Sequence, residues 1–114
     1  MTIRDRIVEL RRVRASELRH NPKNWRTHPT GQRNAVRGVL ADVGYVDALL
    51  ARQRDDGQLE LVDGHLRAET TPDEVVPVLV LDVNEAEADK LLAVLDPLVG
   101  LAQASESALE GLSG

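Results

Sequence analysis

The sequence predicts an α+β fold, with a small mixed sheet of about four strands and three to four helices. Short runs rich in Val, Leu and Ile, which are typical of β-strands, are interspersed with segments whose apolar residues recur at helical spacing. The two kinds of segment mix without the strict strand–helix–strand alternation of a parallel α/β sheet. This irregular order favours the α+β class.

Length and composition indicate one small domain. The 114 residues suffice for a single modest core, and the hydrophobic fraction of 42% is ordinary for a globular chain. Trp25 and Tyr45 are the only aromatic residues, so Val, Leu, Ile and Ala must build the core. So few aromatic rings argue against a stacking platform for single-stranded nucleic acid. We expect the domain over 1–98, followed by a helical or frayed tail over 99–114.

Charge and residue usage narrow the choice of partners. The net charge of −5 makes the chain a poor non-specific binder of nucleic-acid phosphates, so DNA is expected only through another domain or partner. A basic face remains open, because most Lys and Arg residues lie between Arg4 and Arg37. The absence of cysteine excludes disulfides, thiol catalysis and Cys-ligated zinc. No stretch has the length of a membrane span or the pattern of a signal peptide, so we expect a cytoplasmic protein with no membrane partner.

The first half of the chain predicts a strand, a loop and a helix. Alternating apolar residues indicate a strand over 6–13, and the proline-marked polar segment 16–29 indicates a long loop. The helix is predicted over 30–43 and ends at Gly44. Its apolar residues recur at helical spacing: Val36, Val39, Leu40 and Val43.

The second half predicts a hairpin, a short helix, a strand and a final helix. Strands at 46–54 and 58–62 flank the turn signal Asp55-Asp56-Gly57, and a helix from Gly64 to Thr71 stops before Pro72. The apolar run 75–82 is a strand in which Pro77 must lie near the start or on an edge. The last helix begins at the capping pair Asn84 and Glu87, ends at Pro97, and has the stripe Ala88, Leu91, Leu92 and Leu95.

The most informative motif is Asp63-Gly64-His65-Leu66-Arg67, where a strand turns at a glycine into a helix. The unpaired N–H groups and positive dipole end of such a helix favour an anion such as a phosphate. Arg67 lies within one helical turn of Gly64, so its guanidinium can reach the same anion, and His65 can add a donor.

Structural readings of the same residues stay open. Gly64 can relieve a tight turn, Asp63 can cap the helix, and Arg67 can form an ion pair with Asp63 or Glu69. His65 can be a solvated turn residue. The spacing of His20, His28 and His65 fits no compact ligand pattern, so no metal site is predicted.

The order of motifs resembles the ParB/sulfiredoxin superfamily, specifically the ParB-like N-terminal (ParB-like nuclease) domain. It begins with an Asn-Pro-x-x-x-Arg loop at 21–26 and a helix ending in Gly44. A hairpin, Gly-x-x-Arg at Gly64, a Val-rich strand and a Glu-rich helix complete it, so that 13–98 is covered. The resemblance implies that the Gly-x-x-Arg turn holds the phosphates of CTP, ATP or ADP. It also implies a site comprising Gly64, His65, Arg67, Asp63, Asn24 and Arg26.

The chain departs from the family at three places. His65 and Leu66 stand where relatives carry an acid and an arginine. Leu95-Asp96-Pro97 stands where partition proteins carry a magnesium-holding Glu-Asn, which argues against magnesium. The turn has no cysteine, which excludes sulfiredoxin reductase activity.

Three functions follow from these observations. The first is a domain that binds a nucleotide or phosphate ligand, as a module of a phage, plasmid or DNA-modification system. The second is an enzyme, either a nucleotide triphosphatase, kinase-like or nuclease-type, with His65 or Glu69 as the candidate catalytic groups. The third is a degenerate, non-catalytic module for interaction or homodimerisation, which the missing arginine at Leu66 favours.

Overall fold

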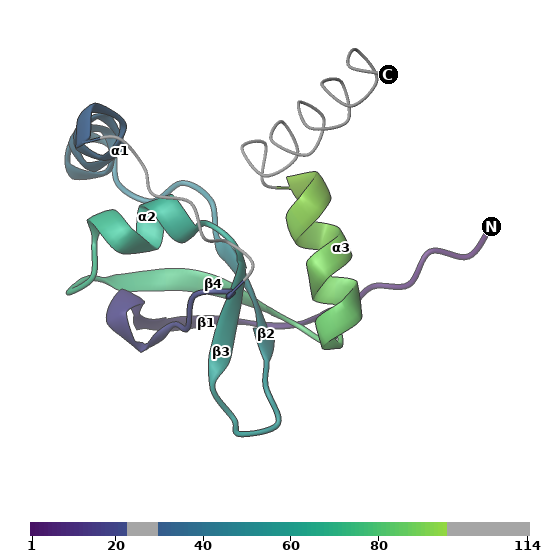
Figure 1. Cartoon of the computed structure of the whole chain (residues 1–114). Coiled ribbons are helices and arrows are strands. Elements are labelled where there is room, and N and C mark those ends of the chain that lie inside the picture. The colour runs from purple at the N-terminus through teal and green to yellow at the C-terminus, as the bar shows by residue number, and fades with distance from the viewer. Residues whose placement is uncertain (23–29, 96–114) are drawn as a thin grey trace, which may run out of the picture.

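The computed structural model describes residues 1–22 and 30–95. Within them lie a four-stranded sheet, three α-helices and one 3₁₀ turn, which confirms the predicted α+β class. The elements, in chain order, are β1 (Ile7–Arg14), the 3₁₀ turn η1 (Ala15–Glu17), α1 (Thr30–Asp42), β2 (Leu49–Gln53), β3 (Leu59–Asp63), α2 (His65–Thr70), β4 (Val75–Leu81) and α3 (Glu85–Leu95). In Figure 1, α2 lies beside α1, and α3 stands apart from both.

The sheet is mixed, as predicted, with the strand order β1-β4-β2-β3. The β1–β4 and β2–β3 pairs are antiparallel, whereas β2 and β4 run parallel. The predicted hairpin turn joins β2 to β3, and Arg54 N–H donates to the Gln58 carbonyl at 2.8 Å. Pro77 pairs with Arg12 of β1, but the pairing of β4 with β2 begins one residue later, at Val78. The proline thus lies near the strand start, as its missing N–H requires.

Both faces of the sheet are covered over part of their area. One face carries the main core, whose strand residues are at most 1% exposed, apart from Leu59 at 6%: Leu49, Ala51, Leu59, Leu61, Val76, Val78 and Val80. Ala15, Leu18 and Ala68, from the η1 and α2 segments, pack against this face. On β3, Val62 alternates with Leu61 and is also fully buried. Since α3 contacts β3 and buries Ala88 and Leu92, the second face is covered there.

The helix α1 forms where predicted, yet none of its residues is buried. The side chains of Val39 and Val43 are 60% and 64% exposed. The main contact of α1 is with α2 rather than with the sheet, so Val39 and Val43 meet solvent, whereas Val36 and Leu40 are half-buried. Helical periodicity predicted the helix correctly, but it did not determine what the apolar face packs against.

The helix α3 begins with the predicted capping box. The Asn84 side chain accepts the Glu87 N–H at 2.8 Å, and the Glu87 carboxylate accepts the Asn84 N–H at 3.0 Å. Leu95, the last residue of the predicted stripe, is 39% exposed. Pro97 and the predicted tail 99–114 lie outside the described residues. In the part of the chain that is described, no helix is long and apolar enough to cross a membrane.

Candidate functional site

The corner between β3 and α2 depends on Gly64. This residue is the N-cap of α2 and has a φ of +100°, a conformation that residues with a Cβ rarely adopt. A Cβ built on Gly64 would lie 2.6 Å from Cγ of Leu49, a fully buried core residue. The corner therefore needs glycine for its backbone conformation and for space. Asp63 ends β3 and is not the N-cap residue.

Arg67 lies between two carboxylates at this corner. Its Nη1 atom pairs with Asp47, and its Nη2 atom lies 3.8 Å from Oδ2 of Asp63. The Asp63 pair matches one of the structural alternatives for Arg67, whereas Glu69 faces His20, with 3.8 Å between Oε1 and Nδ1. The partner that sequence reasoning missed is Asp47, which precedes β2 and is twenty positions away. No periodic pattern pointed to it.

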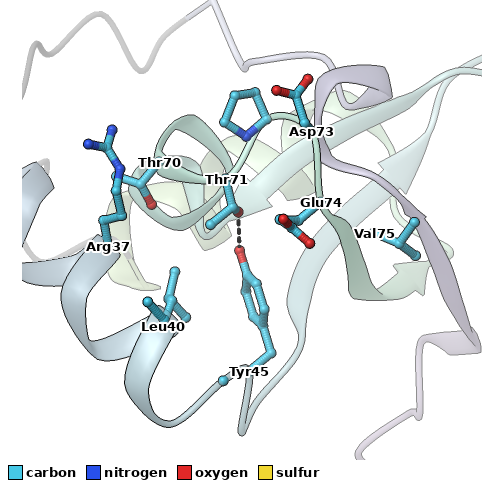
Figure 2. Close-up of a pocket in the computed structure, with 11 residues that line it drawn as sticks. Arg37, Leu40, Tyr45, Thr70, Thr71, Asp73, Glu74 and Val75 are labelled. Atoms are coloured by element: carbon cyan, nitrogen blue, oxygen red, sulfur yellow. Dashed lines mark hydrogen bonds between the residues drawn. The ribbon is translucent and has the colours of Figure 1, made fainter.

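The C-terminal part of α2 is held by Tyr45. The Arg67 carbonyl lies within hydrogen-bond distance of the hydroxyls of Tyr45 at 3.2 Å, Thr70 at 3.0 Å and Thr71 at 2.9 Å. Figure 2 shows the Tyr45 hydroxyl directed at Thr71, with 2.7 Å between the two oxygens. Because α2 has only six residues, its last carbonyl groups lack N–H donors within the helix. The hydroxyl groups supply donors to the Arg67 carbonyl instead.

A hollow of about 530 Å³ lies between α1, the end of α2 and the start of β4 (Figure 2). Its wall mixes apolar side chains such as Leu40 with the charged groups of Arg37, Asp73 and Glu74. Gly64, His65 and Arg67 do not line it. The hollow is therefore distinct from the predicted phosphate site.

The alternative in which His65 is a solvated turn residue is wrong. The residue is 3% exposed, and its Nε2 atom accepts the backbone N–H of Asn21, with 3.3 Å between the nitrogens. The His20 ring lies beside it, at a centroid distance of 5.7 Å. Asn21 itself is 2% exposed. The start of the Asn-Pro segment and the glycine corner are thus in direct contact.

The residues before Asn21 reach the corner along the outer edge of β3. The N–H of Arg19 donates to the Leu59 carbonyl, and its carbonyl accepts the Leu61 N–H, both at 2.8 Å. Asn24 and Arg26, the predicted opposite wall, lie outside the described residues. The same holds for Asp96. Among the residues that are described, no three His, Asp or Glu side chains are grouped so that they could hold a metal ion.

Comparisons with known proteins show the fold. No family model and no curated protein matches the chain. A structure of the partition protein ParB from Caulobacter crescentus with CTP-γ-S matches at a TM-score of 0.69 and 18% identity, over 80% of this chain and 54% of that chain.

Two further solved structures match. Sulfiredoxin from Arabidopsis thaliana gives a TM-score of 0.61 at 10% identity, over 75% of this chain and 98% of that chain. A Pnob8-like ParB-N domain gives 0.56 at 18% identity, over 78% of this chain and 39% of that chain. These similarities show a ParB/sulfiredoxin-like fold, as the sequence motifs predicted. The chain spans about half the length of the Caulobacter ParB chain that it matches.

Proposed function

We propose that this chain, which has a ParB/sulfiredoxin-like fold, binds a nucleotide or a related phosphate ligand at the Gly64 corner. The observation that carries the proposal is the match to ParB complexed with CTP-γ-S, which covers 80% of this chain. The corner supports it, because Gly64 caps the start of α2 and the Arg67 side chain lies within one helical turn of it. CTP, ATP and ADP are the candidate ligands.

Each residue of the proposed site has a role. The first N–H groups of α2 would donate to a phosphate, and the Arg67 guanidinium would pair with it. His65 and Asp63 flank Gly64 on either side and would shape the site. Asn24 and Arg26 would supply the opposite wall. Their part in the proposal rests on the Asn-Pro-x-x-x-Arg motif, since the described residues do not include them.

The carboxylates around Arg67 set an electrostatic condition on binding. One guanidinium lies between Asp47 and Asp63, so an incoming phosphate must compete with Asp47 for Arg67 and is repelled by both acids. A divalent cation carried by the nucleotide would reduce this repulsion. Binding is therefore to be measured with and without magnesium, although the Leu95-Asp96-Pro97 sequence lacks the family's metal-holding pair.

Isothermal titration calorimetry with CTP, ATP and ADP tests the proposal. We expect binding by the wild-type chain and loss of binding in Arg67→Ala. The matched control is Arg54→Ala, because Arg54 is also a partly exposed arginine that faces carboxylates, Asp56 and Glu60, but at the hairpin. No heat with any nucleotide, or equal losses in the two variants, would contradict the proposal.

We also propose that the chain is a module of a larger DNA-associated system. A module of a phage, plasmid or DNA-modification protein would meet DNA through another domain, since the net charge of −5 disfavours direct binding. A gel-shift assay at physiological salt should show no retention of DNA by this chain alone. Retention of DNA at micromolar concentration of this chain would contradict the proposal that DNA is bound only through another domain.

A second candidate function is an interaction or homodimerisation module. The exposed apolar side chains of Val39, Val43 and Val46 favour it, because they lie close together in the sequence and remain in solvent. Sedimentation should then show a dimer that Val39→Ser dissociates, and nucleotides should not raise the melting temperature. A monomer at every concentration would exclude homodimerisation.

The geometry of His65 gives the enzymatic alternative less support. Its Nε2 atom already accepts the Asn21 N–H, so that nitrogen is engaged rather than directed at a substrate. Glu69, the other candidate, faces His20. A turnover assay that compares wild type with His65→Ala tests this function. A selective loss of turnover at unchanged nucleotide affinity would support the enzymatic alternative.

A further inference from the structure

The contact between Asn21 and His65 has a protonation requirement. Nε2 of His65 accepts the Asn21 N–H, and only an unprotonated ring nitrogen can accept a hydrogen bond. The imidazole must therefore be neutral, with its proton on Nδ1. A doubly protonated ring would present an N–H to the N–H of Asn21. The contact exists in one charge state of the ring only.

The hydrogen bond between Asn21 and His65 lies just after the segment that is bonded to β3. Arg19 is attached to β3 by two backbone hydrogen bonds, which do not depend on pH in the neutral range. Asn21 follows two positions later with its N–H bonded to His65, and the residue after it is Pro22, which has no N–H to donate. The Asn21 N–H is thus the last backbone donor before the proline. This donor, at the entry to the Asn-Pro segment, bonds to the imidazole of the corner.

We propose that His65 is a positioning residue, whose neutral ring accepts the Asn21 N–H at the glycine corner and whose protonation breaks this hydrogen bond. This inference rests on the proposed function, and adds that nucleotide binding at Gly64 weakens in acid. The hydrogen bond is present above the pH at which the ring protonates and is lost below it. The ligand then meets a corner whose neighbouring chain has lost this hydrogen bond.

Several titratable and charged groups surround the His65 ring. His20 lies 5.7 Å away, centroid to centroid, and its Nδ1 atom lies 3.8 Å from the Glu69 carboxylate on α2. Asp63 and Arg67 flank His65 at the start of α2, and Glu17 lies on η1, which packs against α2. A positive charge on the His65 ring would therefore arise beside the His20 ring and near the charged groups of α2.

Nuclear magnetic resonance of the nucleotide-free chain tests the contact by itself. At pH 8 we expect the His65 ring nitrogens to show the Nδ1–H tautomer and the Asn21 amide to exchange slowly with solvent. On acidification, the Asn21 amide signal should move with the same midpoint as the His65 ring. An Nε2–H tautomer, or an Asn21 amide insensitive to that titration, would overturn the proposal.

Two variants of His65 distinguish the effect of losing the hydrogen-bond acceptor from the effect of the charge on the ring. His65→Gln places a carbonyl oxygen near the position of Nε2 and does not titrate, whereas His65→Leu removes the acceptor. Loss of one hydrogen bond corresponds to an affinity change of about 3- to 10-fold. Wild-type nucleotide affinity should fall by this factor between pH 8 and pH 5. The affinity of His65→Gln should fall less on acidification than that of the wild type, and that of His65→Leu should be low throughout.

His20→Gln is the matched control, because it removes the neighbouring histidine and leaves the Asn21 contact intact. It should retain the acid weakening of the wild type. If the weakening disappears in His20→Gln and persists in His65→Gln, His20 is the responsible group and the proposal is wrong. If no nucleotide binds at any pH while Asn21 follows the His65 titration, the proposed function fails and the pH-dependent contact stands.

Discussion

Cγ of Leu49 lies 2.6 Å from the position that a Cβ on Gly64 would occupy. A fully buried core side chain of β2 thus closes the corner against any residue larger than glycine. The candidate site and the core share this contact, so a change at the corner must disturb the packing beneath it. Leu49 and Gly64, which are fifteen positions apart in the chain, are therefore coupled by packing.

Gly64→Ala should lower the free energy of unfolding by about 2–4 kcal/mol, from the left-handed backbone and the collision with Leu49. Gly57→Ala is the matched control, because Gly57 has a φ of +84° and open space around its Cβ position. It should lose only about 1–2 kcal/mol, from the backbone alone. Urea denaturation measures both, and equal losses would show that Leu49 yields to the new methyl group.

Asp47→Asn should tighten nucleotide binding by about two- to fivefold, because it removes the carboxylate that competes with phosphate for Arg67. The control is Asp73→Asn, which changes the net charge equally but lies at the hollow near the end of α2. Calorimetry with the preferred nucleotide measures the difference. Weaker binding in Asp47→Asn would mean that Asp47 orients Arg67 for the ligand rather than competing with it.

Glu87→Gln should make the stability less sensitive to acid. The hydrogen bond from Arg6, followed by that from the Asn84 N–H, lowers the pKa of Glu87 to about 2 from its ordinary value of 4.5. A carboxyl with a lowered pKa stabilises the fold above its ordinary pKa, and this contribution disappears as the pH falls from 4.5 towards 2.

Urea denaturation at a series of pH values between 7 and 2 measures this effect, with pH steps chosen around the two pKa values. Glu85→Gln is the control, because Glu85 lies in the same first turn of α3 and shares the helix-dipole term. The wild type and Glu85→Gln should lose stability over the same pH range, and Glu87→Gln should lose less. Identical profiles for all three chains would show that the Arg6 pair does not contribute.

Val39→Ala and Leu92→Ala should differ strongly, although both residues belong to apolar stripes of helical spacing. Val39 of α1 is 60% exposed, so its truncation should change the stability by less than about 0.5 kcal/mol. Leu92 of α3 is 2% exposed, and its truncation should cost about 2–5 kcal/mol. Thermal and urea unfolding of the isolated chain check this. A large loss in Val39→Ala would indicate that a second copy covers α1.

The parts of the fold that short segments encode were predictable. The hairpin at Asp55-Asp56-Gly57 and the capping box of Asn84 and Glu87 formed as expected, because each depends on residues within four positions of one another. The strand–turn–helix corner at Gly64 is of the same kind. Its glycine, its strand and its helix are adjacent in the chain.

The contacts of the site residues were not predictable in the same way. Arg67 meets Asp47 from twenty positions away, and His65 meets Asn21 from forty-four positions away. The exposure of α1 likewise depends on its packing against α2 instead of the sheet. No periodicity carries such information, since it describes one element at a time.

The sequence by itself determined the class, the elements and the glycine corner, because propensity, periodicity and turn chemistry act over a few residues. Only the tertiary structure decided that His65 is buried against Asn21, that Arg67 lies between two carboxylates, and that Val39 and Val43 remain exposed. The physical reason is that burial and ion pairing are set by which distant segments the sheet order brings together.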